Sequence, residues 1–149
     1  MRIVLQRVKS ASVGVADDQV ASIGKGFLAL IAFSRTDSEE VLQWMARKMA
    51  SLRLFEDDDG KMNRDLAEVD GGLLVVSQFT LYGDCTKGKR PSFDKSARAD
   101  QAEVLYERFL EILREEAPCE VRTGAFQEHM TVSLVNDGPV TVILQRESV

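Results

Sequence analysis

The stretch FLALIAF, from Phe27 to Phe33, contains only apolar residues and follows a break at Gly24-Lys25-Gly26. An apolar run of this length predicts a β-strand that is buried on both faces. LLVVSQFTLYG, from Leu73 to Gly83, is predicted to be another buried strand. The elements between and around these two strands then decide the fold class.

Two amphipathic helices are predicted in addition to the buried strands. From Ser38 to about Leu52, apolar residues recur every three or four positions, and Asp37 or Thr36 can cap the first turn. The second helix is predicted to begin near Asp100 and to end before Pro118, which cannot continue it.

Shorter apolar runs complete a mainly β pattern. They predict strands at Ile3 to Val8, Ala11 to Val15, Val20 to Ile23, Cys119 to Arg122, Met130 to Val135 and Val140 to Leu144. Asp57 to Asn63 lacks the alternating ligands and final Glu of a calcium loop, so we expect a solvated loop there. The sequence therefore predicts one α+β domain over residues 1–149, mainly β with two helices.

The composition is that of an ordinary globular protein. The 149 residues are 44% hydrophobic and 29% charged, and the net charge is −5. No apolar run approaches the roughly 20 residues that span a bilayer, and the start lacks a signal-peptide pattern. We therefore expect a cytoplasmic protein with no membrane partner. The acidic balance counts against a large nucleic-acid surface, and DNA is not an expected partner.

The few histidines and cysteines argue against most of the common catalytic sites of hydrolases, such as a zinc site or a Ser-His-Asp triad. His129 is the single histidine and has no metal-ligand partner at helical or turn spacing. Cys85 and Cys119 form no CxxC pair, so we expect free thiols. The sequence therefore predicts neither a metal site nor a cofactor.

Polar side chains interrupt the apolar pattern of the second buried strand. Ser77, Gln78 and Thr80 need hydrogen-bond partners if they are buried. Strand alternation places Ser77 and Phe79 on one face, and it places Gln78 and Thr80 on the other. Gln78 and Thr80 could then share a pocket at the strand end. A half-exposed edge, or hydroxyls bonded to neighbouring backbone, also explains these residues and is favoured by composition alone.

The densest positive charge lies in one loop. Lys87, Lys89 and Arg90 fall within four positions, and phosphates bind where Lys and Arg converge. A run of this kind is more often simply a solvated loop. Arg7 is a further charged residue, in an N-terminal strand, and is either exposed or an anchor for something buried.

Two segments near the C-terminus allow a structural and a functional interpretation. SLVNDGPVT, from Ser133 to Thr141, interrupts an apolar pattern with turn residues, and a connection between two strands is the simpler explanation. Phe126 and Met130 flank a short polar stretch and could wall a pocket, although core packing is the default for both.

The chain resembles the D-aminoacyl-tRNA deacylases over essentially its whole length. The resemblance rests on MRIVLQRVKSASV, LRLFEDDDGKMN, VVSQFTLYGD, KGKRPSF and MTVSLVNDGPVT. SQFTL and NDGPVT, separated by a KGxRPSF loop, are highly specific to that family. The stretch from Phe126 to Met130 is bulkier and more polar than the family pattern, which would alter the pocket rim.

The resemblance implies a hydrolase that cleaves the ester between a D-amino acid and the 3′ end of tRNA. It also implies removal of glycine mischarged onto tRNA-Ala. The expected fold is a homodimer with a barrel-like sheet body, two flanking helices and active sites at the subunit interface. The Gly138-Pro139 peptide is expected to be cis and to enter the partner's pocket as a chiral filter that rejects L-aminoacyl-tRNA.

The resemblance also implies roles for single residues. Ser77, Gln78, Phe79 and Thr80 would form the catalytic strand, with backbone N–H groups near Phe79 and Thr80 facing the scissile carbonyl. A threonine nucleophile needs a nearby base, so we expect the 2′-hydroxyl of the terminal adenosine to help activate water instead. The expected substrate-binding residues are Arg7, which supports the Gly-Pro loop, Phe126 and Met130, which enclose the adenosine, and Lys87, Lys89 and Arg90, which meet phosphate.

Two other functions remain open at this point. An amidase or esterase for small D-amino-acid derivatives would use Thr80 as a covalent nucleophile. A non-catalytic module that binds the tRNA acceptor end would explain the missing triad and metal motif.

Overall fold

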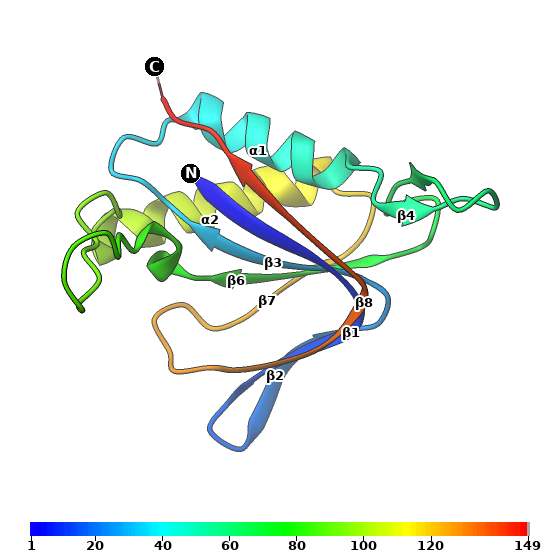
Figure 1. Ribbon diagram of the computed structural model, residues 1–149, viewed down its shortest axis with the longest axis horizontal. Helices are drawn as coiled ribbons and strands as arrows, with labels where there is room; N and C mark the ends of the chain where they lie inside the picture. Colours follow the sequence, from blue (N-terminus) through cyan, green and yellow to red (C-terminus); the bar gives the residue numbers. More distant parts are fainter. Residues whose placement is uncertain (149) are drawn as a thin grey trace.

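A curled six-stranded sheet forms the body of the protein in the computed structural model, which describes residues 1–148 (Figure 1). Its strands are β1 (Arg2–Val15), β2 (Asp18–Ile23), β3 (Gly26–Ala32), β6 (Gly72–Ser77), β7 (Val121–Thr123) and β8 (Thr131–Gln145). The order is β2-β1-β3-β6-β7, and β8 pairs with β1. Because β2 also contacts β6 and β7, the sheet is nearly closed into a barrel.

Helices α1 (Glu39–Ser51) and α2 (Ala99–Glu116) lie side by side on one face of this sheet (Figure 1). Each presents an apolar face to the sheet, because its apolar residues recur with the helical period. The prediction of a mainly β fold with a barrel-like sheet and two helices is therefore confirmed.

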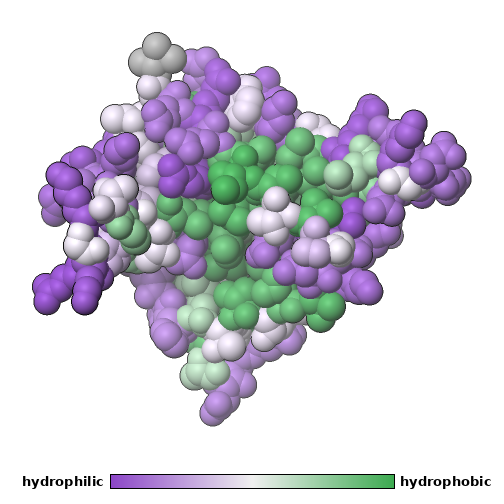
Figure 2. Space-filling model, viewed as in Figure 1, coloured by the Kyte–Doolittle hydropathy of each residue, from purple (hydrophilic) through white to green (hydrophobic). Residues whose placement is uncertain are grey.

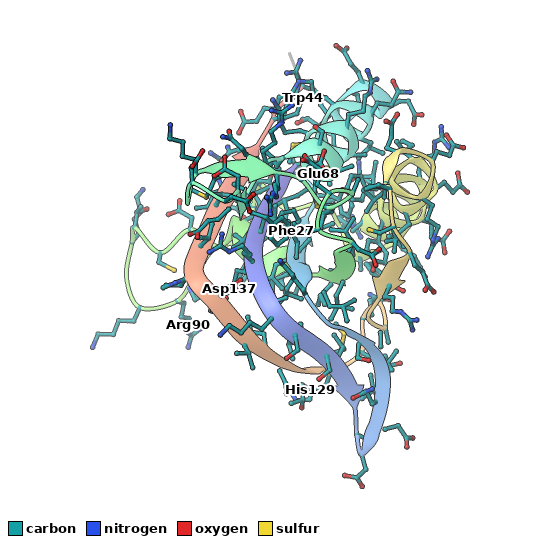
Figure 3. The ribbon with its side chains drawn as sticks, turned by 90° about the vertical axis from the view of Figure 1, so that its right-hand side faces the viewer. Phe27, Trp44, Glu68, Arg90, His129 and Asp137 are labelled. Atoms are coloured by element: carbon teal, nitrogen blue, oxygen red, sulfur yellow. The ribbon has the colours of Figure 1, made fainter. Side chains whose placement is uncertain are left out.

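The strand β3 is buried on both faces, as its apolar run predicts. Phe27 and Ile31 belong to the large core beneath the helices, whereas Leu28 belongs to a second cluster on the opposite face. The Phe27 ring stacks on that of Phe55 at 5.0 Å and lies inside the fold in Figure 3. Full burial of one such side chain contributes about 1.5–3 kcal/mol, so β3 joins both cores.

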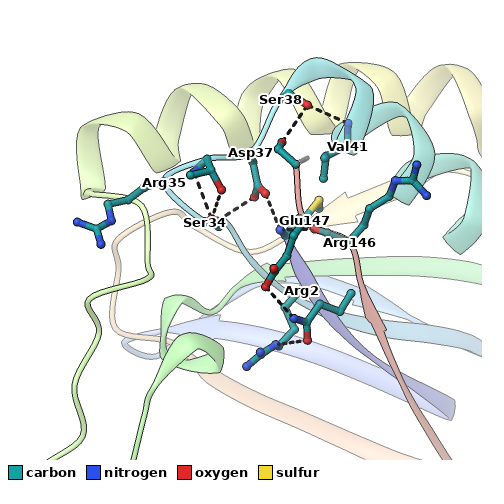
Figure 4. Close-up of polar contacts among 12 residues, drawn as sticks. Arg2, Ser34, Arg35, Asp37, Ser38, Val41, Arg146 and Glu147 are labelled. Atoms are coloured by element: carbon teal, nitrogen blue, oxygen red, sulfur yellow. Dashed lines mark hydrogen bonds and ion pairs between the residues drawn. The ribbon is translucent and has the colours of Figure 1, made fainter.

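The first helix is capped by a different residue from the two that the sequence suggested. Ser38 is the N-cap, and its hydroxyl accepts a hydrogen bond from the Val41 N–H. Asp37 instead binds the amino group of Met1 at 2.6 Å and the Ser34 N–H at 2.8 Å (Figure 4). A buried ammonium needs a partner more than an exposed helix end does, so Asp37 is recruited away from the cap.

Two pairs of predicted strands are in fact single long strands. β1 is continuous where Ile3–Val8 and Ala11–Val15 were expected to be separate. β8 likewise runs through the turn residues from Asn136 to Pro139 without ending. Both strands stay continuous because they pair with each other along nearly their full lengths.

Two further predictions of local structure need correction. The strand predicted from Leu73 to Gly83 ends at Ser77, and the short 3₁₀-helix η1 (Phe79–Tyr82) follows. The predicted loop from Asp57 to Asn63 connects, and partly belongs to, a small hairpin of β4 (Phe55–Glu56) and β5 (Met62–Arg64). Within it, Asp57 accepts hydrogen bonds from backbone N–H groups, which is the ordinary behaviour of an Asp in a turn.

Across residues 1–148, the helices of the structure are too short or too polar to cross a membrane.

Candidate active site

The turn residues of β8 form a bulge opposite Arg7. Gln6 pairs with Thr141 and Val8 pairs with Asn136, so on β1 only Arg7 lies between these two pairs. On β8 the same interval holds residues 137–140. The excess residues push the Gly138–Pro139 segment out of the ladder, and its peptide bond is cis.

The side chain of Arg7 lies beneath this bulge and is almost completely buried, with 5% of its surface exposed. Its Nε donates to the main-chain carbonyl of Asp137 at 2.9 Å, and its Nη1 donates to that of Leu54 at 2.8 Å. A side chain at Gly138 would come within 3.0 Å of Arg7 Nη2, so only glycine fits there without displacement. Of the two alternatives for Arg7, the structure selects the buried anchor.

A cavity of about 660 Å³ opens beyond the carboxyl ends of the parallel strands β6 and β7. This is the edge at which ligands commonly bind to parallel sheets. Its walls come from the end of β6, the start of α2, the segment between β7 and β8, and the start of β8. The lining residues are Val76, Ser77, Gln78, Phe79, Phe93, Ser96, Ala97, Arg98, Ala99, Ala102, Phe126, Gln127, Glu128, His129, Met130 and Val132.

Of the predicted catalytic segment, Ser77 is the last residue of β6, and Ser77, Gln78 and Phe79 line the cavity, whereas Thr80 is not among its lining residues within residues 1–148. Phe79 and Thr80 are the first two residues of η1, so strand alternation does not apply to them. The first N–H groups of a helix have no acceptor within it, which leaves the Phe79 and Thr80 amides available to a ligand. The Thr80 hydroxyl accepts a hydrogen bond from the side-chain amide of Gln78. The side chains of Gln78 and Thr80 therefore meet, as the sequence suggested, but in a 3₁₀-helical turn and not through the alternation of a strand.

The structure brings some of the predicted site residues together and separates others. Ser77, Gln78, Phe79, Phe126 and Met130 line the cavity.

The remaining predicted residues lie elsewhere. Within residues 1–148 the cavity lining does not include Arg7, Gly138 or Pro139, which cluster around the β8 bulge. Lys87, Lys89 and Arg90 lie on an exposed loop, and Figure 3 shows Arg90 on the part of it that projects from the body.

Several cavity residues were not identified from the sequence. Phe93, Ser96 and Arg98 come from the segment that leads into α2. Phe93 is the last residue of the KGKRPSF motif, but the sequence assigned no role to its ring, and no local pattern distinguishes Ser96 or Arg98. Gln127 has a left-handed backbone, with φ of 62°, which is unusual for a residue other than glycine. Its departure from the family pattern was the one indication in the sequence that this part of the rim differs.

Tyr82, at the end of η1, faces the interior. Burial raises the pKa of its phenol to about 12. Its hydroxyl is buried and has no hydrogen-bond partner among the described residues. The Arg2 guanidinium packs over its ring at 4.9 Å and also donates to the main-chain carbonyl of Leu81 at 2.6 Å. Through these two contacts of Arg2, the strand β1 holds η1 in position.

Comparison with known proteins places the chain in a family. A family model described as D-Tyr-tRNA(Tyr) deacylase matches residues 4–145. A D-aminoacyl-tRNA deacylase of Petrotoga mobilis is 52% identical over 99% of this chain and 98% of its own. The protein of the same description from Chlorobaculum tepidum is 54% identical over 97% of each chain.

Two solved structures share the fold. One, titled "c-Myc DNA Unwinding Element Binding Protein", has a TM-score of 0.93 and 39% identity over 99% of this chain and 100% of its own. The other is titled as a structural analysis of a probable eukaryotic D-amino acid tRNA deacylase. It has a TM-score of 0.82 and 21% identity over 96% of this chain and 97% of its own, which supports the fold alone.

Proposed function

This chain belongs to the D-Tyr-tRNA(Tyr) deacylase family and is a hydrolase, and we propose from that premise how its cavity cleaves D-aminoacyl-tRNA. The function rests on one observation, the match to curated D-aminoacyl-tRNA deacylases at about 52% identity over nearly the full chain. Such relatives favour the enzyme over the non-catalytic binding module.

The proposed reaction is hydrolysis of the ester at the 3′ end of tRNA. Water adds to the ester carbonyl, and collapse of the intermediate releases the free D-amino acid and restores the ribose hydroxyl of the tRNA. The Phe79 and Thr80 amides, free at the start of η1, would stabilise the oxyanion that forms on the carbonyl oxygen. Removing one such donor in other enzymes costs about 10²–10³ in kcat.

The 2′-hydroxyl of the terminal adenosine is the proposed activator of the attacking water. Thr80 is a poor nucleophile candidate, because the hydrogen bond of its hydroxyl is to the Gln78 amide, which is not a base. His129, the single histidine, lies on the cavity rim, at a labelled position near the start of β8 in Figure 3. A reaction assisted by its own substrate needs neither side chain as a base.

Chirality would be set by the Gly138–Pro139 segment of a second copy of the chain. The segment does not line the cavity of its own chain as far as residues 1–148 describe it, so it can filter the ligand only from a partner. Its backbone carbonyls would bind the substrate α-amino group and occupy the volume that an L side chain needs. A D side chain, or the hydrogen of glycine mischarged onto tRNA-Ala, would clear them.

The exposed outer edge of β8 supports a homodimer. β8 is 15 residues long, and within residues 1–148 it pairs with a strand on one side only, β1. Along this strand, Val135 is 52% exposed and Ile143 is 67% exposed. Figure 2 shows apolar side chains gathered over the middle of the face of the molecule that is seen in Figure 1. A long apolar edge strand pairs with other chains unless it is covered, and a second copy would cover it.

The remaining roles follow the same proposal. Phe126 and Met130 would enclose the terminal adenosine, and Lys87, Lys89 and Arg90 would contact tRNA phosphate. Residues 1–149 would act as one domain, in the cytoplasm, without a metal or cofactor. That the chain does not bind DNA stays a prediction, since a similar structure carries a DNA-binding title.

The decisive experiment is a time course of deacylation with matched D-tyrosyl- and L-tyrosyl-tRNA, with and without a chelator. We expect rapid loss of the D ester only, at a rate that the chelator does not change. Survival of both esters would contradict the proposed function. Hydrolysis of free D-tyrosine esters at rates similar to the tRNA ester would instead favour the small-molecule esterase.

A further inference from the structure

The ring of Phe79 is unusually exposed for its size. Its relative exposure is 54%, and it lies on the edge of the cavity rather than in either apolar core. Its partner is Phe93, whose ring centroid lies 5.2 Å away with an interplanar angle of 62°. This edge-to-face pair fixes the orientation of the Phe79 ring and leaves about half of its surface free.

The loop with the densest positive charge begins and ends beside this aromatic pair. Asp84 and Ser92 exchange two backbone hydrogen bonds, at 2.7 and 2.9 Å, and so close the base of the loop. Phe93 follows directly, and its ring packs so closely on Gly83 that a side chain at Gly83 would meet it at 3.2 Å. The cations at positions 87, 89 and 90 are therefore carried on a loop that is anchored at the edge of the cavity.

We propose that Phe79, held by Phe93, together with this basic loop forms a subsite for the nucleotide that precedes the terminal adenosine of the tRNA. The base of that nucleotide stacks on the exposed surface of Phe79, and the phosphate that links it to the adenosine lies toward Lys87 and Lys89. This inference rests on the proposed function, because it concerns the same substrate one nucleotide further from the ester.

The chemistry fits a single-stranded nucleic acid end. Proteins that hold single strands combine aromatic rings, on which bases of any type stack, with Lys and Arg that follow the phosphates. An aromatic ring without cations would suit many apolar ligands, and cations without a ring would suit any anion. The combination at the edge of a cavity that takes the terminal nucleoside favours the adjacent nucleotide.

The test uses three D-tyrosyl esters that differ only in the length of RNA: adenosine, the dinucleotide CpA and full tRNA. For the unmodified protein, kcat/KM is expected to rise about tenfold from adenosine to CpA, the scale of one stacked base. Phe79→Leu should remove most of this rise, mainly through KM. Phe79→Tyr should retain it, because tyrosine keeps the aromatic face.

The phosphate contact has its own measurement. For the CpA ester, the logarithm of kcat/KM should fall with the logarithm of salt concentration with a slope of about −0.7 for one phosphate contact on a single strand. The adenosine ester should show no slope. The double variant Lys87→Gln, Lys89→Gln should flatten the CpA slope, whereas the control Lys61→Gln, on the distant β4–β5 loop, should not.

Three outcomes would overturn the subsite. They are equal rates for the adenosine and CpA esters, an equal loss for both esters in Phe79→Leu, and a change of oligomeric state in Phe79→Leu that accounts for its loss. The first means that no neighbouring nucleotide is bound, and the second places Phe79 at the terminal adenosine. Failure to hydrolyse any D ester would contradict the proposed function itself and so stays distinct from these three.

Discussion

The guanidinium Nε of Arg7 donates to the main-chain carbonyl of Asp137 at 2.9 Å, and so fixes the residue that leads into the Gly138–Pro139 segment. The same guanidinium donates to Leu54, which ties the β8 bulge to the body of the fold. In the proposed site, Arg7 is therefore expected to be a positioning residue, because it binds the residue that leads into the Gly138–Pro139 segment and does not line the cavity within residues 1–148.

We expect Arg7→Gln to lower both stability and chiral selectivity. Loss of charge-assisted hydrogen bonds from a buried site costs about 2–4 kcal/mol of unfolding free energy. Selectivity, measured as the ratio of kcat/KM for D- and L-tyrosyl-tRNA, should fall at least about tenfold, the equivalent of 1.4 kcal/mol. Arg47→Gln is the control, because its ion pair with Glu116 is exposed and should change stability by less than about 1 kcal/mol. Full selectivity in folded Arg7→Gln would refute the positioning role.

Pro139→Ala should admit L-aminoacyl-tRNA. The pyrrolidine ring fixes φ of this residue, and alanine would let the backbone carbonyls of the segment leave the position in which they are proposed to exclude an L side chain. The readout is hydrolysis of L-tyrosyl-tRNA by a variant shown to be folded and dimeric. Pro118→Ala, in the exposed segment after α2, is the matched control and should still reject the L ester. Identical D over L ratios in both variants would remove the filter role from this segment.

Thr80→Ala should keep most of its activity. Its hydroxyl accepts a hydrogen bond from the side-chain amide of Gln78, whereas its proposed contribution is the backbone N–H, which alanine retains. We expect kcat for D-tyrosyl-tRNA to fall by less than about tenfold. Removal of a true nucleophile costs on the order of 10⁴–10⁶. A loss of that size, with substrate binding intact, would restore Thr80 as the covalent nucleophile.

Ile143→Lys should convert the proposed dimer into monomers. Ile143 is 67% exposed on β8, and a charge on an edge strand opposes pairing with another chain. Sedimentation would measure the mass, and the D over L ratio should fall together with it, since the proposed filter is supplied by the partner. Val104→Lys offers a close comparison, because Val104 has the same 67% exposure but lies on α2. A monomeric native protein with full selectivity would be incompatible with a filter supplied by the partner.

The alkaline stability of the protein should depend on its tyrosines. Burial raises the pKa of both Tyr82 and Tyr106 to about 12, whereas tyrosine in an unfolded chain titrates near 10. Because the folded state holds each phenol neutral, this contribution to stability is complete below about pH 10 and is lost as pH rises toward 12. Ultraviolet absorbance of the phenolate, compared between native and denatured protein, measures the shift.

The variant Tyr82→Phe distinguishes the contribution of Tyr82 from that of Tyr106. The Tyr82 hydroxyl is buried without a partner among residues 1–148, so its removal should be neutral or should stabilise the protein by about 1 kcal/mol. The remaining native titration should then belong to Tyr106. A loss of stability of more than about 2 kcal/mol in Tyr82→Phe would mean that the hydroxyl is hydrogen-bonded in solution.

The segment from Ser77 to Tyr82 shows where the sequence misleads. Its apolar composition continues that of β6, and alternation predicts one long strand. The chain instead leaves the sheet after Ser77 and turns into η1. The Gln78 N–H still bonds to the carbonyl of Ile31, so the change occurs where the neighbouring strand β3 ends and no further ladder partner is available.

The amino-acid sequence by itself determines the elements whose periodicity is strong. The apolar run of β3 specifies a strand buried on both faces, and the three- and four-residue spacing of α1 specifies a helix buried on one face. In each case only that arrangement removes the apolar side chains from water. The motifs SQFTL and NDGPVT likewise suffice to place the chain in its family.

Only the tertiary structure decides the site. Whether the turn residues end a strand or bulge from it depends on the pairing of β8 with β1, on which Arg7 lies about 130 positions from Asp137 in the sequence and faces the bulge across the ladder. The cavity joins the end of β6, the start of α2 and the segment before β8, which meet because the sheet curls. Local propensities carry no information on such distant pairings, since register and closure are set by packing between segments that only folding brings together.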